Sequence, residues 1–135
     1  MLNVTCALII KNKKVLITQN GPESDHAFQW EFPGGKVKND ESDEESIIRE
    51  IYEELELNIK TLERMLPVEH EYKIKRIRLI PFICNISNGS LKLNNHINKK
   101  WLGFEELYKI DFSEADQRLI EFTKNKEILK KYTGE

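Results

Sequence analysis

The N-terminal third of the chain has the hydrophobic and polar pattern of strands. From Leu2 to Ile10 both alternating sets of positions are mostly apolar, which predicts a strand that is buried on both faces. The polar segment from Lys11 to Lys14 predicts a turn, and Val15 to Gln19 predicts a second strand. We therefore expect a β-hairpin whose first strand lies in the interior of a sheet.

The following segment leads through a loop to a pair of glycines. Asn20 to Ala27 contains Gly, Pro, Ser and Asp, which predicts a loop. Phe28, Trp30 and Phe32 then alternate with other residues and predict an aromatic strand that enters Pro33-Gly34-Gly35. Glycines at this point permit positive φ angles and a close approach of the backbone to other groups.

A helical pattern begins after the glycines. Ser42 and Glu45 have the spacing of a capping box, which predicts that the helix begins at Ser42. Arg49 can pair with Glu45 or Glu53, each four residues away on the helix. Apolar residues at helical spacing form the expected buried stripe, which consists of Ile47, Ile48, Ile51 and Leu55.

The second half of the chain predicts more strands and a terminal helix. Leu62 to Tyr72 and Lys75 to Ile86 each have the pattern of one strand, and Pro81 predicts that the second lies at an edge or carries a bulge. Lys99 to Leu102 predicts a last short strand, and Ser113 to Tyr132 predicts one long helix.

Length, composition and charge bound the type of protein. We expect one domain from 135 residues, and 39% hydrophobic with 33% charged residues is typical of a globular chain. A net charge of −2 argues against a broad basic face for long nucleic acid but leaves room for a small anionic ligand. Cys6 and Cys84 lie in apolar runs and are expected to be buried thiols. No apolar run reaches the length of a membrane span, so we expect no membrane partner and a cytoplasmic protein. We further expect a monomer or a weak homodimer.

Three carboxylates are the main candidates for chemistry. Glu50, Glu53 and Glu54 are three and four residues apart and should share one helix face. Such a row is often only a solvated helix face. Here it lies near the helix C-terminus, where negative charge opposes the helix dipole, and a bound cation would offset that unfavourable interaction. Oxygen ligands alone favour Mg²⁺ or Mn²⁺.

The stretch around these carboxylates resembles the Nudix box of the Nudix hydrolases. The box consists of Gly, five residues, Glu, seven residues, Arg-Glu, an aliphatic residue, any residue, Glu-Glu, any residue, Gly and an aliphatic residue. Its positions are occupied here by Gly35, Glu41, Arg49, Glu50, Ile51, Glu53, Glu54 and Leu57. Glu56 stands where the box has Gly, and a non-glycine residue in the left-handed conformation there costs about 1 kcal/mol.

The resemblance implies both a fold and a reaction. The fold is α+β, a Nudix-type α/β/α sandwich with a mixed β-sheet between helices. The reaction is hydrolysis of a nucleoside diphosphate linked to another group. By position in the box, Glu50, Glu53 and Glu54 are expected to bind Mg²⁺ (or Mn²⁺) with help from the carbonyl of Gly34. Glu50 is also a candidate for activating water, and Arg49 is expected to orient a catalytic glutamate.

Features outside the box resemble the MutT-like branch, which cleaves nucleoside triphosphates to the monophosphate and pyrophosphate. They are the chain length, the Trp-Glu-Phe-Pro-Gly-Gly entry and the Glu-Ala-Asp-Gln segment. The substrate would then be a nucleotide, either an oxidised or modified one resembling 8-oxo-dGTP or one resembling CTP. Asp116 matches the residue that bonds the base in this branch, although it also suits an ordinary acid in the first turn of a helix. Lys36, Asn20 and Tyr72 are further expected substrate contacts.

Two positions depart from the MutT-like pattern. Gln19-Asn20 stands where the branch has a substrate-binding Arg, and Asn95, beside His96, stands where it has a metal-binding or basic Glu. A neutral amide cannot accept a proton as a general base, so another acid such as Glu69 or Glu71 is a candidate substitute. Two alternatives to the triphosphatase therefore stay open: a Nudix hydrolase of a dinucleotide or nucleotide sugar, and a nucleotide-binding sensor with little catalysis.

Overall fold

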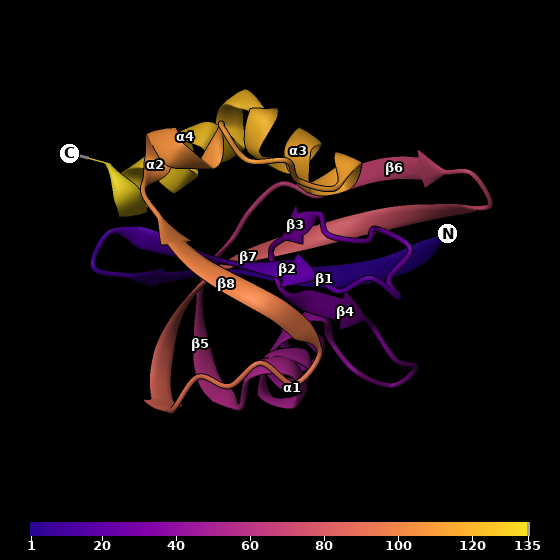
Figure 1. The fold of residues 1–135 in the computed structure, drawn as a ribbon, viewed down its shortest axis with the longest axis horizontal. Helices are drawn as coiled ribbons and strands as arrows, with labels where there is room; N and C mark the ends of the chain where they lie inside the picture. Colours follow the sequence, from indigo (N-terminus) through magenta and orange to yellow (C-terminus); the bar gives the residue numbers. More distant parts are fainter. Residues whose placement is uncertain (135) are drawn as a thin grey trace.

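The computed structural model describes residues 1–134, in which an eight-stranded mixed sheet lies between helices (Figure 1). The strands are β1 (Leu2–Lys11), β2 (Lys14–Asn20), β3 (Trp30–Glu31), β4 (Gly34–Lys36), β5 (Leu57–Arg64), β6 (Val68–Tyr72), β7 (Lys75–Gly89) and β8 (His96–Leu102). The helices are α1 (Asp43–Leu55), α2 (Phe104–Leu107), α3 (Glu114–Glu121) and α4 (Thr123–Thr133).

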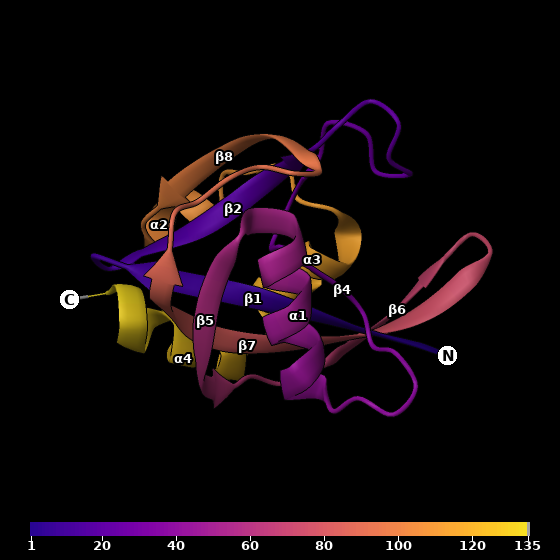
Figure 2. The same cartoon turned by 90° about the horizontal axis from the view of Figure 1, so that it is seen from below.

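Strand β1 lies at the centre of the sheet, as its doubly apolar pattern predicts. It pairs in parallel with β7 along one edge, and antiparallel with β4 and the end of β2 along the other. Helix α1 covers one face of the sheet, and α2, α3 and α4 cover the opposite face (Figures 1 and 2). Cys6 and Leu8 belong to the core under α3 and α4, whereas Ala7 and Ile9 belong to the core under α1. The expected hairpin and α/β/α sandwich are confirmed.

The buried stripe of α1 is narrower than predicted. Ile47, Ile51 and Leu55 are fully buried, but Ile48 is 39% exposed. Residues four apart lie on one line of a helix, and Ile48 lies about 100° round from that line, away from the sheet. Including Ile48 in the stripe was therefore wrong.

The aromatic strand is also shorter than predicted, since only Trp30 and Glu31 are in β3. Phe28 has a φ of 65° and is 56% exposed. Its N–H donates to the carbonyl of Asn20 at 3.0 Å, which closes the loop between β2 and β3. The chain turns at Phe28 instead of running straight.

Leu62 to Tyr72 forms parts of two strands, β5 and β6, and the expected long terminal helix is the pair α3 and α4. One side chain contributes to both breaks. Asn125 accepts from the N–H of Leu66 at 2.8 Å and donates to its carbonyl at 3.0 Å, so it replaces a strand partner there. It also donates to the carbonyl of Leu119 at 3.1 Å, near the C-terminus of α3. The chain between the helices is extended at Phe122.

Pro81 does not lie at an edge of the sheet. On one side of β7 it is opposite Cys6 of β1. On the other side β5 pairing ends opposite Phe82 and β6 pairing begins opposite Leu79, so Pro81 faces the gap between two partners. That gap needs no backbone donor from β7, which explains how proline is tolerated inside a long strand.

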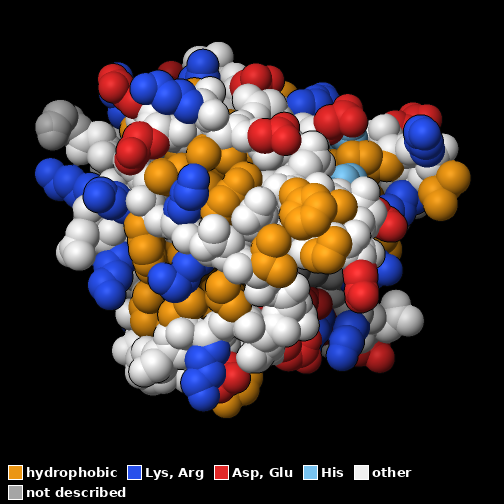
Figure 3. All heavy atoms as spheres, viewed as in Figure 1, with side chains coloured by type: hydrophobic (Ala, Val, Ile, Leu, Met, Phe, Trp, Pro, Cys, Tyr) orange, Lys and Arg blue, Asp and Glu red, His pale blue; other side chains and the backbone are white. Residues whose placement is uncertain are grey.

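The surface carries charges of both signs. On the face that shows β8, hydrophobic side chains gather near the middle of the view with some basic side chains among them, and further acidic and basic side chains lie around the rim (Figure 3). None of the helices within residues 1–134 is long and apolar enough to cross a membrane.

Candidate active site

The two glycines before α1 are required by close packing. A Cβ on Gly35 would lie 2.5 Å from Oε2 of Glu50 and still nearer to the other carboxylate atoms. A Cβ on Gly34 would lie 2.7 Å from the Cα of Cys6 in the paired strand β1. The sequence predicts that these glycines allow a positive φ and a close approach of the backbone. The close approach is confirmed, whereas neither glycine has a positive φ. Glu50 can reach β4 only because residue 35 lacks a side chain.

Local signals fix both ends of α1. The N–H of Glu45 donates to Oγ of Ser42 at 3.0 Å, and the N–H of Ser42 donates to Oε1 of Glu45 at 2.8 Å, which confirms the capping box. At the other end Glu56 has φ 56° and ψ 32°, and its N–H donates to the carbonyl of Tyr52. Glu56 thus keeps the left-handed conformation expected of glycine.

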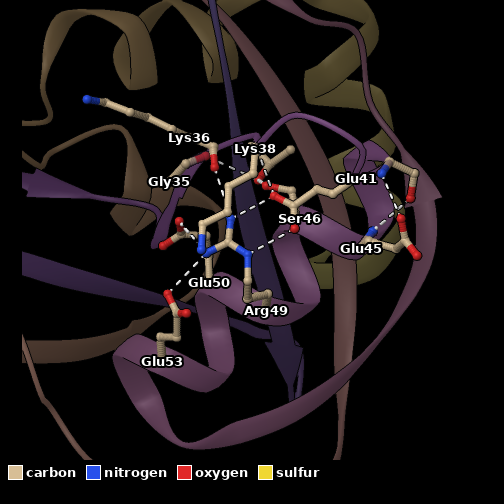
Figure 4. Close-up of polar contacts among 11 residues, drawn as sticks. Gly35, Lys36, Lys38, Glu41, Glu45, Ser46, Arg49, Glu50 and Glu53 are labelled. Carbon is tan, nitrogen blue, oxygen red and sulfur yellow. Dashed lines mark hydrogen bonds and ion pairs between the residues drawn. The ribbon is translucent and has the colours of Figure 1, made fainter.

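Arg49 holds the acidic residues of the box in place (Figure 4). Its guanidinium donates twice to the Glu41 carboxylate, at 2.9 and 2.7 Å. It also donates to Glu50 at 3.0 Å, to Glu53 at 3.1 Å and to the backbone carbonyl of Lys36 at 3.1 Å. The predicted pair with Glu53 is confirmed, whereas Glu45 is engaged in the helix cap. The hydrogen bonds from Arg49 lower the pKa of Glu41 to about 2, so Glu41 is a carboxylate at neutral pH.

Glu50, Glu53 and Glu54 lie on α1, where Glu50 packs on Gly35 and the charges of Glu50 and Glu53 act on Glu54. Burial, followed by the charges of Glu31 and Glu50, raises the pKa of Glu54 to about 9. Oε1 of Glu54 is buried and has no hydrogen-bond partner within the described residues. A buried carboxylate oxygen without a donor, close to further negative charges, is a suitable ligand for a hard divalent cation.

The box carboxylates do not yet have the mutual arrangement of a complete metal site. Within residues 1–134, no group of His, Cys, Asp and Glu side chains is already arranged to hold a metal ion. Glu50 and Glu53 each have one oxygen bonded to Arg49, and only Glu54 has an orphaned buried oxygen. The donor types fit Mg²⁺ or Mn²⁺, and the role of these residues as ligands stays a prediction.

A cleft of about 230 Å³ extends from the two glycines to the start of α3. Gly34, Lys36, Tyr72 and Asp116 all line it, so the fold brings together four of the residues that the sequence singles out. The Lys36 side chain extends away from the Arg49 network in Figure 4 and is exposed. Tyr72 packs against the rings of His26 and His70, with centroids 4.8 and 4.7 Å away.

Asp116 is a buried acid at the wall of this cleft. It is 6% exposed, and Oδ2 accepts from the N–H of Phe32 at 2.8 Å. Burial and then the charge of Glu31 raise the pKa of Asp116 well above its ordinary range. The acid is therefore tied to the segment before the glycines, and more of it stays protonated than for an exposed aspartate.

Asn20 does not line the cleft. Its amide donates to Oε1 of Glu31 at 3.2 Å, and Nε2 of His96 lies 3.0 Å from Oε2 of the same carboxylate. Glu31 itself lines the cleft with Gly34 and Asp116. Glu31 and His96 are residues near the site that the sequence patterns do not single out. The sequence feature that could have indicated Glu31 is its negative charge between the aromatic residues Trp30 and Phe32, close to the two glycines.

Glu69 and Glu71, the candidate substitutes for the glutamate that is absent at position 95, lie on β6 outside the cleft. Glu69 and Glu71 are on β6, where their side chains are 57% and 77% exposed and each lies 3.9 Å from Arg76. Neither lines the cleft that contains Gly34 and Asp116. Asn95 itself is exposed. Strand β6 packs against α3, whereas α1, which carries the box carboxylates, packs against β1, β4 and β5.

Residues 5–122 match the family described as NUDIX domain. The chain belongs to the Nudix hydrolase family. This Nudix hydrolase is 32% identical over 121 residues to the CTP pyrophosphohydrolase of Escherichia coli (strain K12), covering 90% of each chain. It is 30% identical over 118 residues to an 8-oxo-dGTP diphosphatase of Buchnera aphidicola subsp. Schizaphis graminum (strain Sg), covering 87% of this chain and 89% of the relative. Its fold is similar to the crystal structure of a MutT protein from Methanosarcina mazei Go1, with a TM-score of 0.81, 25% identity, and coverage of 96% and 93%.

Proposed function

We propose that this Nudix hydrolase cleaves a nucleoside triphosphate to the monophosphate and pyrophosphate, using Mg²⁺. The observation that carries the proposal is the orphaned buried oxygen of Glu54, whose pKa is raised by the neighbouring charges of Glu31 and Glu50 after burial. Gly35, which packs on Glu50, lines the cleft. The two curated relatives support the substrate class, because both are named for hydrolysis of a nucleoside triphosphate.

The box residues then have distinct roles. Glu50, Glu53 and Glu54, with the carbonyl of Gly34, would hold Mg²⁺, which supplies neutralisation of phosphate charge and a polarised water. Glu50 is fixed between Arg49 and the bare backbone of Gly35, and it is our candidate to accept the proton of the attacking water. Arg49 would orient Glu50 and Glu53, to which it donates at 3.0 and 3.1 Å.

The other end of the cleft would receive the nucleoside. A protonated Asp116 can donate a hydrogen bond to a base, whereas a carboxylate can only accept. Lys36 and Lys75 both line the cleft and offer positive charge to phosphates in place of the arginine missing at position 20. We propose Tyr72 as an apolar wall beside the base. Cytosine and 8-oxoguanine nucleotides are the two substrate types to compare, because the relatives divide between them.

The test is a panel of purified substrates assayed for pyrophosphate release with Mg²⁺, with Mn²⁺ and with excess chelator. The panel contains CTP, dCTP, dGTP, 8-oxo-dGTP, a dinucleoside tetraphosphate and a nucleotide sugar. We expect metal-dependent release from at least one triphosphate and none with chelator. The Glu53→Gln variant should abolish the activity, and Glu69→Gln, which changes an exposed acid on β6, should keep it.

Two results would reject the proposal. Faster cleavage of the dinucleotide or nucleotide sugar than of every triphosphate would assign a different Nudix substrate. Tight triphosphate binding by calorimetry without turnover of any compound would assign a sensor.

A further inference from the structure

The carboxylate of Glu31 contacts two side chains, those of Asn20 and His96, and Glu31 also lines the cleft. Asn20 donates to Oε1 at 3.2 Å, and Nε2 of His96 lies 3.0 Å from Oε2. An ionised carboxylate has about four acceptor positions, so two remain after these contacts. Glu31 is still 23% exposed and lines the cleft. Its position is fixed, yet it keeps acceptor capacity on the cleft side.

The sheet irregularity beside Glu31 explains why both supporting residues reach it. Strand β2 pairs with β3 at Thr18 and Gln19, and with β8 along its other edge. The register between β2 and β8 shifts between Gln19 and Asn20, so that Asn20 is opposite His96. Such a bulge redirects side chains at the end of a strand. Here it brings an amide and an imidazole onto one carboxylate.

His96 is a buried polar residue whose ring makes a contact with Glu31 through one nitrogen only. Its side chain is only 3% exposed, and Nδ1 has no hydrogen-bond partner within the described residues. Burying a ring with an unpartnered nitrogen is unfavourable, and the contact of Nε2 with Glu31 partly offsets this cost. The arrangement resembles the outer partners that orient ligands in metal sites.

Glu31 also lies beside the box carboxylates. It lines the cleft with Gly34 and Gly35, and Gly35 packs directly on Glu50. Its negative charge is the largest charge contribution to the raised pKa of Glu54, ahead of Glu50. Asn95, by contrast, is exposed and neutral, and neither Glu69 nor Glu71 of β6 lines this cleft.

We propose that Glu31 is a fourth carboxylate of the cation site, and that His96 and Asn20 are positioning residues that hold it there. The inference rests on the proposed metal-dependent function and deepens it. Glu31, on β3, supplies the negative oxygen that the neutral Asn95 cannot. His96 directs the carboxylate through Nε2, and Asn20 fixes its other oxygen.

The test is Mn²⁺ binding without nucleotide, measured by calorimetry and by the electron paramagnetic resonance of free Mn²⁺. We expect Glu31→Gln to weaken binding by about 10-fold or more, a loss in the range found for groups that build metal sites. Glu54→Gln is the positive control and should also weaken binding. Glu69→Gln is the matched control, because it removes one carboxylate at an exposed position on β6, and it should bind like the wild type.

The positioning role is tested by two changes at His96. The glutamine amide of His96→Gln can still donate to Glu31, whereas His96→Ala cannot. We expect His96→Ala to weaken Mn²⁺ binding by about 10-fold, and His96→Gln to restore most of that loss. Thermal unfolding of each variant reports the structural effect separately. This pair also carries the test if Glu31→Gln does not fold.

The outcomes separate the inference from the proposed function. If Glu54→Gln weakens Mn²⁺ binding and Glu31→Gln does not, the inference is wrong while the metal-dependent function stands. Unchanged Mn²⁺ binding with a raised KM would make Glu31 a nucleotide contact and would likewise overturn the inference. Equal losses for folded His96→Ala and His96→Gln would remove the positioning role. If the wild type binds no Mn²⁺, both proposals fail together.

Discussion

Adding one methyl group at Gly35 or at Gly34 should separate catalysis from folding. In Gly35→Ala the new Cβ would meet the carboxylate end of Glu50, 2.5 Å from Oε2. In Gly34→Ala it would meet the backbone of β1, 2.7 Å from the Cα of Cys6 and 2.8 Å from the carbonyl carbon of Thr5. A side-chain end can rotate away, but the backbone of a central strand cannot.

The magnitudes follow from these contacts. The Glu50 carboxylate would have to retreat by about 1 Å to reach ordinary van der Waals distance from the methyl group. A displacement of that size at a reacting group lowers the rate by about 100-fold, or about 2.7 kcal/mol in the transition state. The folded state should lose only about 1 kcal/mol. Gly34→Ala should lose about 3 kcal/mol of stability, because β1 and β4 would have to separate.

The assays are pyrophosphate release under saturating Mg²⁺ and urea unfolding of the same preparations. We expect Gly35→Ala to be folded and about 100-fold less active, and Gly34→Ala to be less stable. Wild-type activity in Gly35→Ala would refute the claim that this contact fixes a catalytic Glu50. Equal destabilisation of the two variants would refute the distinction between the two contacts.

Three further predictions concern the charges of the box. Arg49→Lys should lower kcat about 10-fold or more with little change in KM, since lysine cannot make the two-pronged contact with Glu41, and a raised KM alone would contradict this. The pKa of Glu41 is lowered from 4.5 to about 2, so its contribution to stability is present above pH 4.5 and is lost as the pH falls toward 2. The difference in thermal midpoint between wild type and Glu41→Gln should therefore shrink over that interval, and a constant difference would oppose the assignment. Because the pKa of Glu54 is raised to about 9, Mg²⁺ must displace a proton there, and calorimetry should show affinity rising about tenfold from pH 7 to pH 8. A pH-independent affinity would argue against Glu54 as a ligand.

Local spacing in the sequence predicts the box well. The capping box at Ser42 and the pairing of Arg49 with Glu53 each involve residues within about one helical turn. Interactions of that range are set by helix geometry and need no knowledge of the fold. The alternation in β1 similarly predicts its central position, because only an interior strand buries both faces. The left-handed Glu56 follows instead from the resemblance to the box, which has Gly at that position.

The parts that sequence reasoning missed depend on distant partners. Glu31 meets His96 across 65 positions, through a bulge that no local pattern reveals. The break between β5 and β6 depends on Asn125, which is 59 positions from Leu66. Ile48 has the right residue type for a core position but the wrong angle on α1. Each miss required the tertiary arrangement of the sheet, which hydrophobic periodicity does not specify.

The central claim is that the box carboxylates hold Mg²⁺ for cleavage of a nucleoside triphosphate. Its most direct test is pyrophosphate release from CTP and 8-oxo-dGTP by the wild type and by Glu54→Gln, each with Mg²⁺ and with chelator. We predict metal-dependent release by the wild type and loss of that release in a folded Glu54→Gln protein. Equal release by both proteins, or release that persists with chelator, would contradict the claim.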